Sequence, residues 1–140
     1  MIKKNVVGII LKNKKILLQL RDNKKNIIFP NKWGFFGGEV NLNEDHFLAI
    51  KRELYEELNI KNFQSLKFIN RHFEAKYNAI FYIYKISLVE NFTLKEGADC
   101  DFFLEYQILK GKKSKKNNIF YKAAEVQLMN KIFKISKRFL

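Results

Sequence analysis

The sequence predicts an α+β fold in a single domain that spans residues 1–140. Strand-like and helix-like segments follow one another in the order strands, helix, strands, helix, which suits a layered α+β domain. The chain has 140 residues, which is enough to bury one hydrophobic core. It contains no internal repeat and no Pro- or Gly-rich linker that would mark a boundary between two domains.

Two strands, a loop and a helix are predicted for the first part of the chain. Residues 5–11 and 16–21 are rich in apolar and β-branched side chains, and the polar stretch KNKK between them is typical of a short turn. Residues 22–34 contain the only proline and predict a loop. Residues 44–58 predict a helix, because apolar side chains recur there at helical spacing. This apolar stripe consists of Phe47, Ile50, Leu54 and Leu58.

Further strands and a closing helix are predicted for the rest of the chain. Residues 66–74 and 78–89 predict two strands, the second of them rich in aromatic side chains. The segment EGADCDFFLEY, residues 96–106, predicts a loop and a short strand that leads into a turn. Residues 109–118 predict a basic loop, and residues 121–138 predict a helix. The apolar side of this helix consists of Ala124, Leu128, Ile132 and Ile135.

The chain is strongly basic, with 27 Lys and Arg residues, 14 Asp and Glu residues and a net charge of +13. The lysines are spread along the whole chain, which favours an ordinary solvated surface. Lys, Asn, Ile and Phe are all abundant and all have AT-rich codons, so genome composition accounts for much of the charge. The alternative is attraction to a polyanion such as a nucleotide or RNA.

We expect a cytoplasmic protein that has no membrane partner. The longest apolar runs, VVGIIL and AIFYIY, are far shorter than the ~20 residues that a membrane span needs. Lysines follow the first run, where a signal peptide would have a small-residue cleavage site. Cys100 is the only cysteine, which excludes an intrachain disulfide and a cysteine-based metal site.

Three glutamates share one side of the predicted helix 44–58. With Glu53 placed at zero, Glu57 lies at about +40° and Glu56 at about −60° around the helix axis. Like charges at this spacing destabilise a helix, and glutamates late in a helix oppose its dipole. A hard divalent cation such as Mg²⁺ or Mn²⁺ would remove the repulsion. The alternative is an ordinary solvated acidic face.

The segment around these glutamates, GEVNLNEDHFLAIKRELYEELNI, closely resembles the signature of the Nudix hydrolases, the MutT-like pyrophosphohydrolases. That signature is G, five residues, E, seven residues, then R-E-U-x-E-E-x-G-U, in which U is a bulky aliphatic residue. The matching residues are Gly38, Glu44, Arg52, Glu53, Leu54, Glu56, Glu57 and Ile60. The segments LLQLRD, PNKWGFFGGEV and EGADCDFF are similar to those that flank the signature. The resemblance implies a Nudix-type α/β/α sandwich with a mixed sheet.

The two ends of the predicted helix carry their own signals. Asn41 followed by Glu44 is typical of a capping box, with Asn43 as a competing N-cap. Asn59 stands where the Nudix signature has Gly. Asn is, after Gly, the residue that best tolerates the left-handed conformation, so we expect a left-handed helix end at Asn59.

The resemblance also implies the reaction and its residues. Nudix hydrolases cleave a nucleoside diphosphate linked to another group by attack of water on phosphorus, with Mg²⁺ as cofactor and Mn²⁺ as a substitute. The expected metal ligands are Glu53, Glu56, Glu57 and the carbonyl group of Gly38. One of the three glutamates would be the general base; which one differs within the family, and Glu53 is the first choice. Arg52 would orient the carboxylates, and Glu57 and Glu44 complete the expected catalytic set. For Glu44, helix capping is an equal alternative.

Four residues are candidates for substrate binding. Arg21, at the end of a strand, could reach a phosphate, and its alternative is an ordinary surface position. The aromatic candidates for stacking on a base are Trp33, Phe35 and Phe81. Core or loop packing is the alternative for each of these aromatic residues. His72 is a further acid–base candidate, although a lone His is more often not catalytic.

The substrate class that the resemblance implies is a small nucleotide, either a nucleoside triphosphate such as an oxidised dNTP or a nucleotide sugar. One alternative is a pyrophosphohydrolase of RNA 5′ ends, which the basic loop and the net charge favour. A second alternative is a non-catalytic nucleotide-binding module on the same scaffold, although the complete acidic cluster argues against it. A homodimer is also expected from the resemblance.

Overall fold

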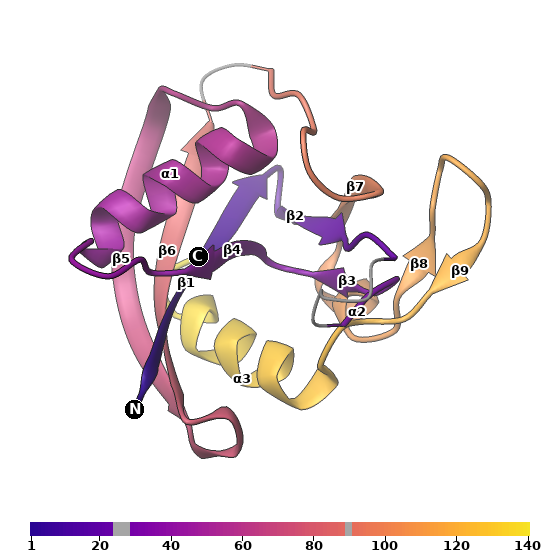
Figure 1. Ribbon diagram of the computed structural model, residues 1–140. Coiled ribbons are helices and arrows are strands. Elements are labelled where there is room, and N and C mark those ends of the chain that lie inside the picture. Colours follow the sequence, from indigo (N-terminus) through magenta and orange to yellow (C-terminus); the bar gives the residue numbers. More distant parts are fainter. Residues whose placement is uncertain (24–28, 89–90) are drawn as a thin grey trace.

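The computed structural model describes residues 1–23, 29–88 and 91–140 (Figure 1). The strands of the main sheet are β1 (Lys3–Lys12), β2 (Lys15–Leu20), β3 (Trp33–Gly34), β4 (Phe36–Glu39), β5 (Phe63–Glu74), β6 (Ala79–Leu88) and β7 (Asp99–Phe103). The helices are α1 (His46–Leu58), α2 (Glu105–Ile108) and α3 (Val126–Lys137), with a 3₁₀ turn at Ala75–Tyr77. A separate hairpin consists of β8 (Lys112–Lys113) and β9 (Phe120–Tyr121).

The main sheet is mixed. Its strand order is β3-β2-β1-β6-β5, with β4 also paired to β1 and β7 paired to β2. β1 runs parallel to β6 and antiparallel to β2 and β4. β5 and β6 form a long antiparallel pair whose register shifts between Phe68 and Asn70.

The sheet lies between α1 on one face and α3 on the other (Figure 1). β1 is buried on both faces, as its unbroken apolar run predicts. Val6 and Ile10 pack in the core beneath α1, whereas Val7 and Ile9 pack in the core beneath α3. This arrangement confirms the expected α/β/α sandwich.

The first turn of α1 differs from the prediction. The N-cap is Asp45, whose side chain accepts a hydrogen bond from the backbone N–H of Leu48 at 2.8 Å. Asn41 is therefore not the N-cap, and neither is Asn43. The Glu44 carboxylate still accepts the Asn41 backbone N–H at 3.0 Å, so half of the expected capping box forms one turn before the helix.

The end of α1 agrees with the prediction. Asn59 has φ 56° and ψ 35°, which is the left-handed conformation. Its backbone N–H donates to the Tyr55 carbonyl at 3.0 Å, and the Ile60 N–H donates to the Leu54 carbonyl at 3.4 Å. Asn59 thus replaces the Gly of the signature without changing the way the helix ends.

The buried stripe of α1 is displaced from the predicted one. Phe47 is 45% exposed, whereas Ala49 is fully buried. The buried residues of the helix are Ala49, Ile50, Leu54, Glu57 and Leu58. A carboxylate therefore lies within the buried side of the helix, next to the apolar core.

The C-terminal helix begins later than residue 121. Phe120 and Tyr121 pair with Lys112 and Lys113 as strand β9, so the predicted basic loop 109–118 is in part a hairpin. The chain then runs beside β3, where Trp33 N–H donates to the Lys122 carbonyl at 2.9 Å. None of the helices in the described ranges has the length and apolar composition that crossing a membrane requires. Residues 24–28 of the predicted loop and residue 89 of the predicted strand 78–89 lie outside those ranges.

Candidate active site

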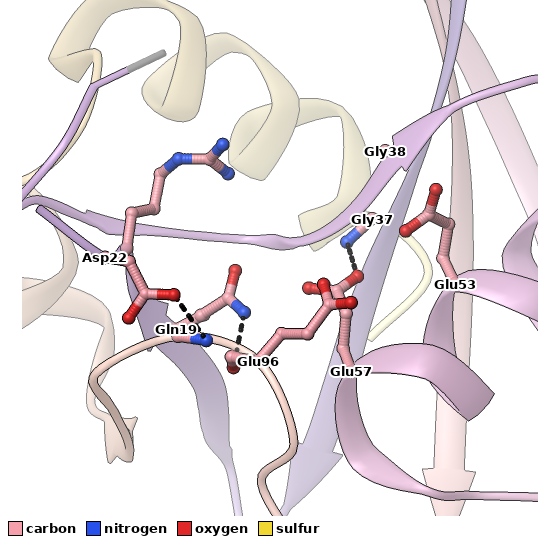
Figure 2. Close-up of a pocket in the computed structure, with 9 residues that line it drawn as sticks. Gln19, Asp22, Gly37, Gly38, Glu53, Glu57 and Glu96 are labelled. Carbon is pink, nitrogen blue, oxygen red and sulfur yellow. Dashed lines mark hydrogen bonds between the residues drawn. The ribbon is translucent and has the colours of Figure 1, made fainter. Parts of the chain in front are cut away.

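A pocket of about 270 Å³ opens beside the C-terminal half of α1 (Figure 2). One wall comes from α1 and β4, and the other comes from the end of β2 and the loop that precedes β7. Its lining residues are Gln19, Arg21, Asp22, Gly37, Gly38, Glu53, Glu57, Glu96 and Gly97. The pocket therefore combines one cationic side chain with carboxylates from three separate segments.

Two glycines let the backbone of β4 approach the carboxylates of α1. A Cβ atom at Gly38 would overlap the carboxylate of Glu53. Gly37 has φ 145°, and a Cβ there would overlap the backbone carbonyl of Val6. The Gly37 N–H donates to Glu57 Oε1 at 3.3 Å (Figure 2). A side chain at either glycine would thus disturb the pocket.

Burial sets the electrostatics of the two pocket glutamates. Glu57 is only 3% exposed, and its burial raises its pKa to about 9, with the neighbouring Glu53 charge as the second cause. Burial also raises the pKa of Glu53, although Arg52 opposes that change. In the metal-free protein, the pair therefore retains a proton at neutral pH, because two close and poorly solvated carboxylates do not ionise together readily.

Glu56 is placed differently from the other two glutamates. Its side chain is 44% exposed, and it does not line the pocket. It pairs with Arg52, one turn earlier in the helix, at 3.4 Å. In the ranges that the structure describes, no group of three or more His, Cys, Asp or Glu side chains is arranged to hold a metal ion. The structure thus brings Glu53 and Glu57 together at the pocket but leaves Glu56 outside it.

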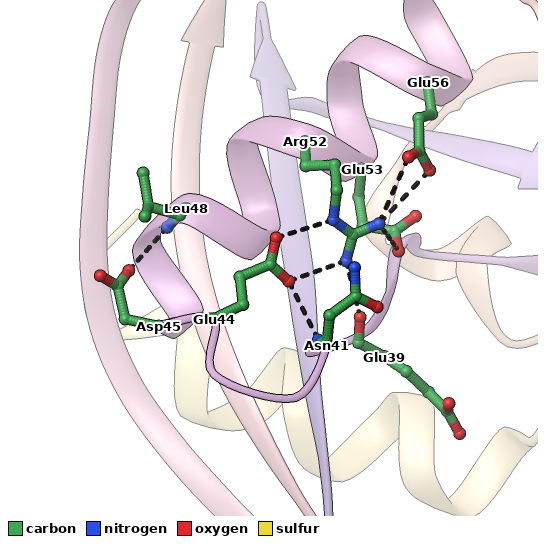
Figure 3. A network of polar contacts seen from close by, with 8 residues as sticks. All are labelled: Glu39, Asn41, Glu44, Asp45, Leu48, Arg52, Glu53 and Glu56. Atoms are coloured by element: carbon green, nitrogen blue, oxygen red, sulfur yellow. Dashed lines mark hydrogen bonds and ion pairs between the residues drawn. The ribbon is translucent and has the colours of Figure 1, made fainter.

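Arg52 connects the carboxylates of this region (Figure 3). It binds Glu44 through Nε at 2.8 Å and through a terminal nitrogen at 3.0 Å, in a bidentate arrangement. Its other terminal nitrogen donates to Glu53 Oε1 at 3.0 Å. A further hydrogen bond of 2.9 Å reaches the backbone carbonyl of Glu39, which ends β4. Arg52 therefore fixes Glu53 relative to both β4 and the turn before α1.

Glu44 lies at this network and not at the pocket. Its hydrogen bonds to Arg52 are the main cause that lowers its pKa, and the Asn41 N–H contributes as well. Its side chain is 16% exposed, and it does not line the pocket. The placement favours the structural alternative for Glu44, in which it holds Arg52 and the turn before α1.

Two further acidic side chains at the pocket, Asp22 and Glu96, were not predicted from the sequence. Glu96 belongs to the loop before β7, and its charge contributes to the raised pKa of Glu57. The backbone N–H groups of Lys95 and Glu96 donate to the Glu57 carbonyl at 2.7 and 3.4 Å. Gln19 Nε2 donates to the Glu96 carbonyl at 2.9 Å, and the Gly97 N–H donates to Asp22 Oδ2 at 3.3 Å (Figure 2). The only sequence signal for Glu96 was the likeness of EGADCDFF to a flanking segment.

The predicted substrate-binding residues are divided between the pocket and the core. Arg21 lines the pocket, and its binding of a phosphate stays a prediction. Trp33 is fully buried against Phe103, and its indole N–H donates to the Lys112 carbonyl at 3.0 Å. The prediction that Trp33 stacks on a base is therefore wrong, because neither ring face is accessible.

The two phenylalanine candidates and the histidine also lie away from the pocket lining. Phe35 and Phe81 are half-buried and pack against the core beneath α3. The proposed stacking by these rings stays a prediction. His72 Nε2 lies 3.0 Å from Glu74 Oε2, on β5, and is not among the pocket residues. His72 is therefore not positioned to act as an acid or base on a substrate in the pocket.

Comparison with known proteins identifies relatives in sequence and in structure. An 8-oxo-dGTP diphosphatase from Buchnera aphidicola subsp. Schizaphis graminum (strain Sg) is 41% identical over 56 residues, which are 40% of this chain and 42% of that protein. The chain thus matches less than half the length of this curated relative. The MutT protein from Methanosarcina mazei Go1 has a TM-score of 0.73 at 18% identity, over 98% of this chain and 94% of that one.

A second solved structure agrees with the first. DR0079 from Deinococcus radiodurans has a TM-score of 0.73 at 16% identity, over 94% of this chain and 83% of that chain. At such identities these likenesses concern the fold. The NUDIX domain family matches residues 2–122, which is most of the chain and includes the signature segment 38–60. The chain therefore belongs to the NUDIX domain family.

Proposed function

We propose that this protein is a divalent-metal-dependent pyrophosphohydrolase that acts on a nucleoside diphosphate linked to a further phosphate or other group. One observation carries the proposal: Glu53 and Glu57 lie together against Gly37 and Gly38 in a pocket that Arg21 also lines. Family membership and the name of the Buchnera relative support the same class of reaction.

The pocket residues fit a hard divalent cation. Mg²⁺ and Mn²⁺ prefer oxygen ligands, and the buried Glu57 and the half-buried Glu53 supply carboxylate oxygens beside Glu96. A bound cation would favour the ionised carboxylates and so lower their pKa, against the effect of burial. Glu53 and Glu57 would hold the ion, and the Gly38 backbone lies against them. When bound, a divalent ion neutralises the diphosphate and lowers the pKa of a bound water.

The residues of the chain have separate tasks in this proposal. Arg21 would bind a phosphate of the substrate across the pocket from α1. Glu53, whose orientation is fixed by Arg52, would accept the proton of the attacking water as general base. The water oxygen then bonds to phosphorus while the anhydride P–O bond breaks, and the leaving phosphate departs with the bond electrons. Most of the rate enhancement would come from positioning and charge stabilisation.

For the substrate, we propose a nucleoside triphosphate, with 8-oxo-dGTP as the first to test. The support is the Buchnera relative, whose name states that activity. The pocket is consistent with a di- or triphosphate. Its carboxylates can hold a divalent cation that binds phosphate oxygens, and the Arg21 guanidinium can bind a phosphate directly. Magnesium is the proposed ion, with manganese as its substitute.

A hydrolysis panel tests the proposal. Purified protein is incubated with Mg²⁺ and with 8-oxo-dGTP, dGTP, dATP or a nucleotide sugar, and products are identified by chromatography. We expect metal-dependent cleavage at a phosphoric anhydride bond, and a loss of at least about 100-fold in Glu57→Gln. Glu39→Gln is the matched control, because Glu39 is exposed and outside the pocket. Equal activity of Glu57→Gln and Glu39→Gln would overturn the assignment.

A further inference from the structure

The β8–β9 hairpin carries a concentrated positive charge away from the pocket. Residues 109–122 contain six lysines and no Asp or Glu. Figure 1 shows the hairpin projecting at one side of the molecule, while α1 lies at the other. None of the residues of the hairpin segment lines the pocket, whose carboxylates come from Asp22, Glu53, Glu57 and Glu96.

Buried aspartates of β7 hold the inner side of the hairpin. Asp99 accepts hydrogen bonds from Ser114 Oγ at 2.7 Å and from the Lys115 backbone N–H at 3.2 Å. Asp101, which is 5% exposed, pairs with Lys112 at 2.9 Å and with Lys115 at 3.0 Å. The hairpin is therefore fixed to the sheet by its inner side, and its outer side faces solvent.

Hydrogen bonds within the hairpin fix the shape of its tip. Ser114 N–H donates to the Ile119 carbonyl at 2.9 Å, and Asn118 N–H donates to the Ser114 carbonyl at 2.8 Å. Asn117 accepts the Ile119 N–H at 3.0 Å and donates to the Tyr121 hydroxyl at 2.9 Å. A tip ordered in this way loses little conformational entropy when it binds a partner.

The outer side combines lysines with apolar and aromatic side chains. Ile119 is 53% exposed and Phe120 is 51% exposed. Phe120 is the cross-strand partner of Lys113, so an exposed ring lies beside a lysine on the same ribbon. The exposed lysines of this segment are Lys110, Lys113, Lys115, Lys116 and Lys122.

We propose that the β8–β9 hairpin is a binding surface for single-stranded nucleic acid, separate from the hydrolytic pocket. Lysines that follow a ribbon suit the phosphates of an extended strand, and an exposed ring among them suits stacking on a base. The exposed lysines are distributed over β8, the tip and the residues on either side of the hairpin, which favours contacts with several phosphates over those of one nucleotide.

An anionic membrane fits the hairpin less well. The tip consists of polar residues, Lys115, Lys116, Asn117 and Asn118, whereas the exposed apolar pair lies further back. Side chains that enter a lipid interface would need to be at the tip. The favoured partner is therefore a nucleic acid strand that lies along the hairpin.

Fluorescence anisotropy with a labelled oligouridine of about 12 nucleotides tests the proposal. We expect wild-type affinity to fall with salt at a logarithmic slope of about −2, as for three phosphate contacts. The variant Lys113→Glu/Lys116→Glu should bind at least about tenfold more weakly. Lys67→Glu/Lys134→Glu is the matched control, with the same charge change on exposed residues of β5 and α3. It should stay within about twofold of wild type.

Two further variants separate charge from stacking and from catalysis. Phe120→Ala should weaken oligouridine binding about fivefold or more but leave binding to heparin, a polyanion without bases, unchanged. Glu57→Gln should bind oligouridine as wild type does, and Lys113→Glu/Lys116→Glu should hydrolyse nucleotides as wild type does. This pair of results keeps the hairpin proposal distinct from the proposed hydrolysis.

Specific results would overturn the hairpin proposal. Equal binding of oligouridine by Lys113→Glu/Lys116→Glu and by its control would show that the charges of Lys113 and Lys116 do not contribute to binding. Unchanged oligouridine binding by Phe120→Ala would remove the base-stacking role. Binding to phosphatidylserine vesicles without binding to oligouridine would assign the hairpin to a membrane surface.

Discussion

The guanidinium group of Arg52 binds the carboxylate of Glu44 through two contacts, of 2.8 and 3.0 Å. This pair ties the middle of α1 to the turn that precedes it, and the same guanidinium contacts Glu53 and the end of β4. The two side chains are 25% and 16% exposed, so solvent screens the pair only in part. Arg52 thus couples the stability of the helix start to the position of a pocket carboxylate.

Replacing Arg52 with Lys keeps the charge and removes the bidentate geometry. We expect the free energy of unfolding to fall by about 1–2 kcal/mol, because Glu44 and the Glu39 carbonyl lose charge-assisted hydrogen bonds. Hydrolysis should fall as well, because Glu53 loses its orientation. Urea denaturation and steady-state kinetics measure the two effects, and Lys51→Arg, on the exposed side of α1, is the control. Wild-type stability and activity in Arg52→Lys would contradict this role.

Replacing Gly38 with Ala tests the close approach of β4 to α1. The new Cβ would overlap the Glu53 carboxylate, so we expect hydrolysis to fall at least about tenfold. Gly34→Ala is the matched control, because a Cβ there would have only an ordinary 3.5 Å contact with Ala124. The prediction fails if the two alanine variants are equally active.

Replacing Glu57 with Gln should stabilise the metal-free protein increasingly as the pH rises. The pKa of Glu57 is about 9 in the folded protein and about 4.3 in an unfolded chain, so the unfolded chain loses its proton first. The stability associated with protonated Glu57 is complete below about pH 4 and is lost as the pH rises towards 9. Gln cannot ionise and avoids this loss.

Thermal unfolding in a chelating buffer, measured at several pH values, checks this prediction. The melting temperature of Glu57→Gln should exceed that of wild type, and the difference should grow between about pH 5 and pH 9. A difference that is constant or shrinks with pH would contradict the buried position of the Glu57 carboxyl. Glu39→Gln should show no such trend, because Glu39 is exposed.

Replacing Asn59 tests the left-handed end of α1. Asn59→Ala should lower the free energy of unfolding by about 1 kcal/mol, because a left-handed conformation is costly for Ala. Asn59→Gly should be at least as stable as wild type. Asn62→Ala, in the loop that follows, is the control, because Asn62 is not left-handed. Chemical denaturation measures the free energy of unfolding of each variant, and equal stability of the Ala and Gly variants would refute the prediction.

The part of the site on α1 could be predicted because its residues are close in sequence. Helical spacing alone places Glu53 and Glu57 side by side, and a Gly pair just upstream predicts a close backbone approach. The same spacing predicts that Glu56 is a metal ligand as much as Glu53 and Glu57 are. The i, i+4 spacing also predicts that Arg52 can hold Glu56, and the structure contains this ion pair, but spacing alone could not show that it lies outside the pocket.

The opposite wall of the pocket depends on contacts between distant segments. Glu96 reaches Glu57 because its loop is bonded to the end of α1 and to Gln19, which no local pattern indicates. The buried state of Trp33 likewise follows from its contacts with Phe103 and Lys112, about 70 to 80 residues away. The N-cap at Asp45 was not predicted, because segment 41–45 contains several Asn and Asp residues and each of them has a similar N-cap propensity.

Manganese binding tests the central claim most directly, because it needs no knowledge of the substrate. Isothermal titration calorimetry at neutral pH would compare wild type with Glu53→Gln, Glu57→Gln and the exposed control Glu39→Gln. We expect wild type and Glu39→Gln to bind Mn²⁺ with the same affinity, and both pocket variants to bind at least about tenfold more weakly. The same Mn²⁺ affinity in all four proteins would contradict the assignment of Glu53 and Glu57 as the metal-binding carboxylates.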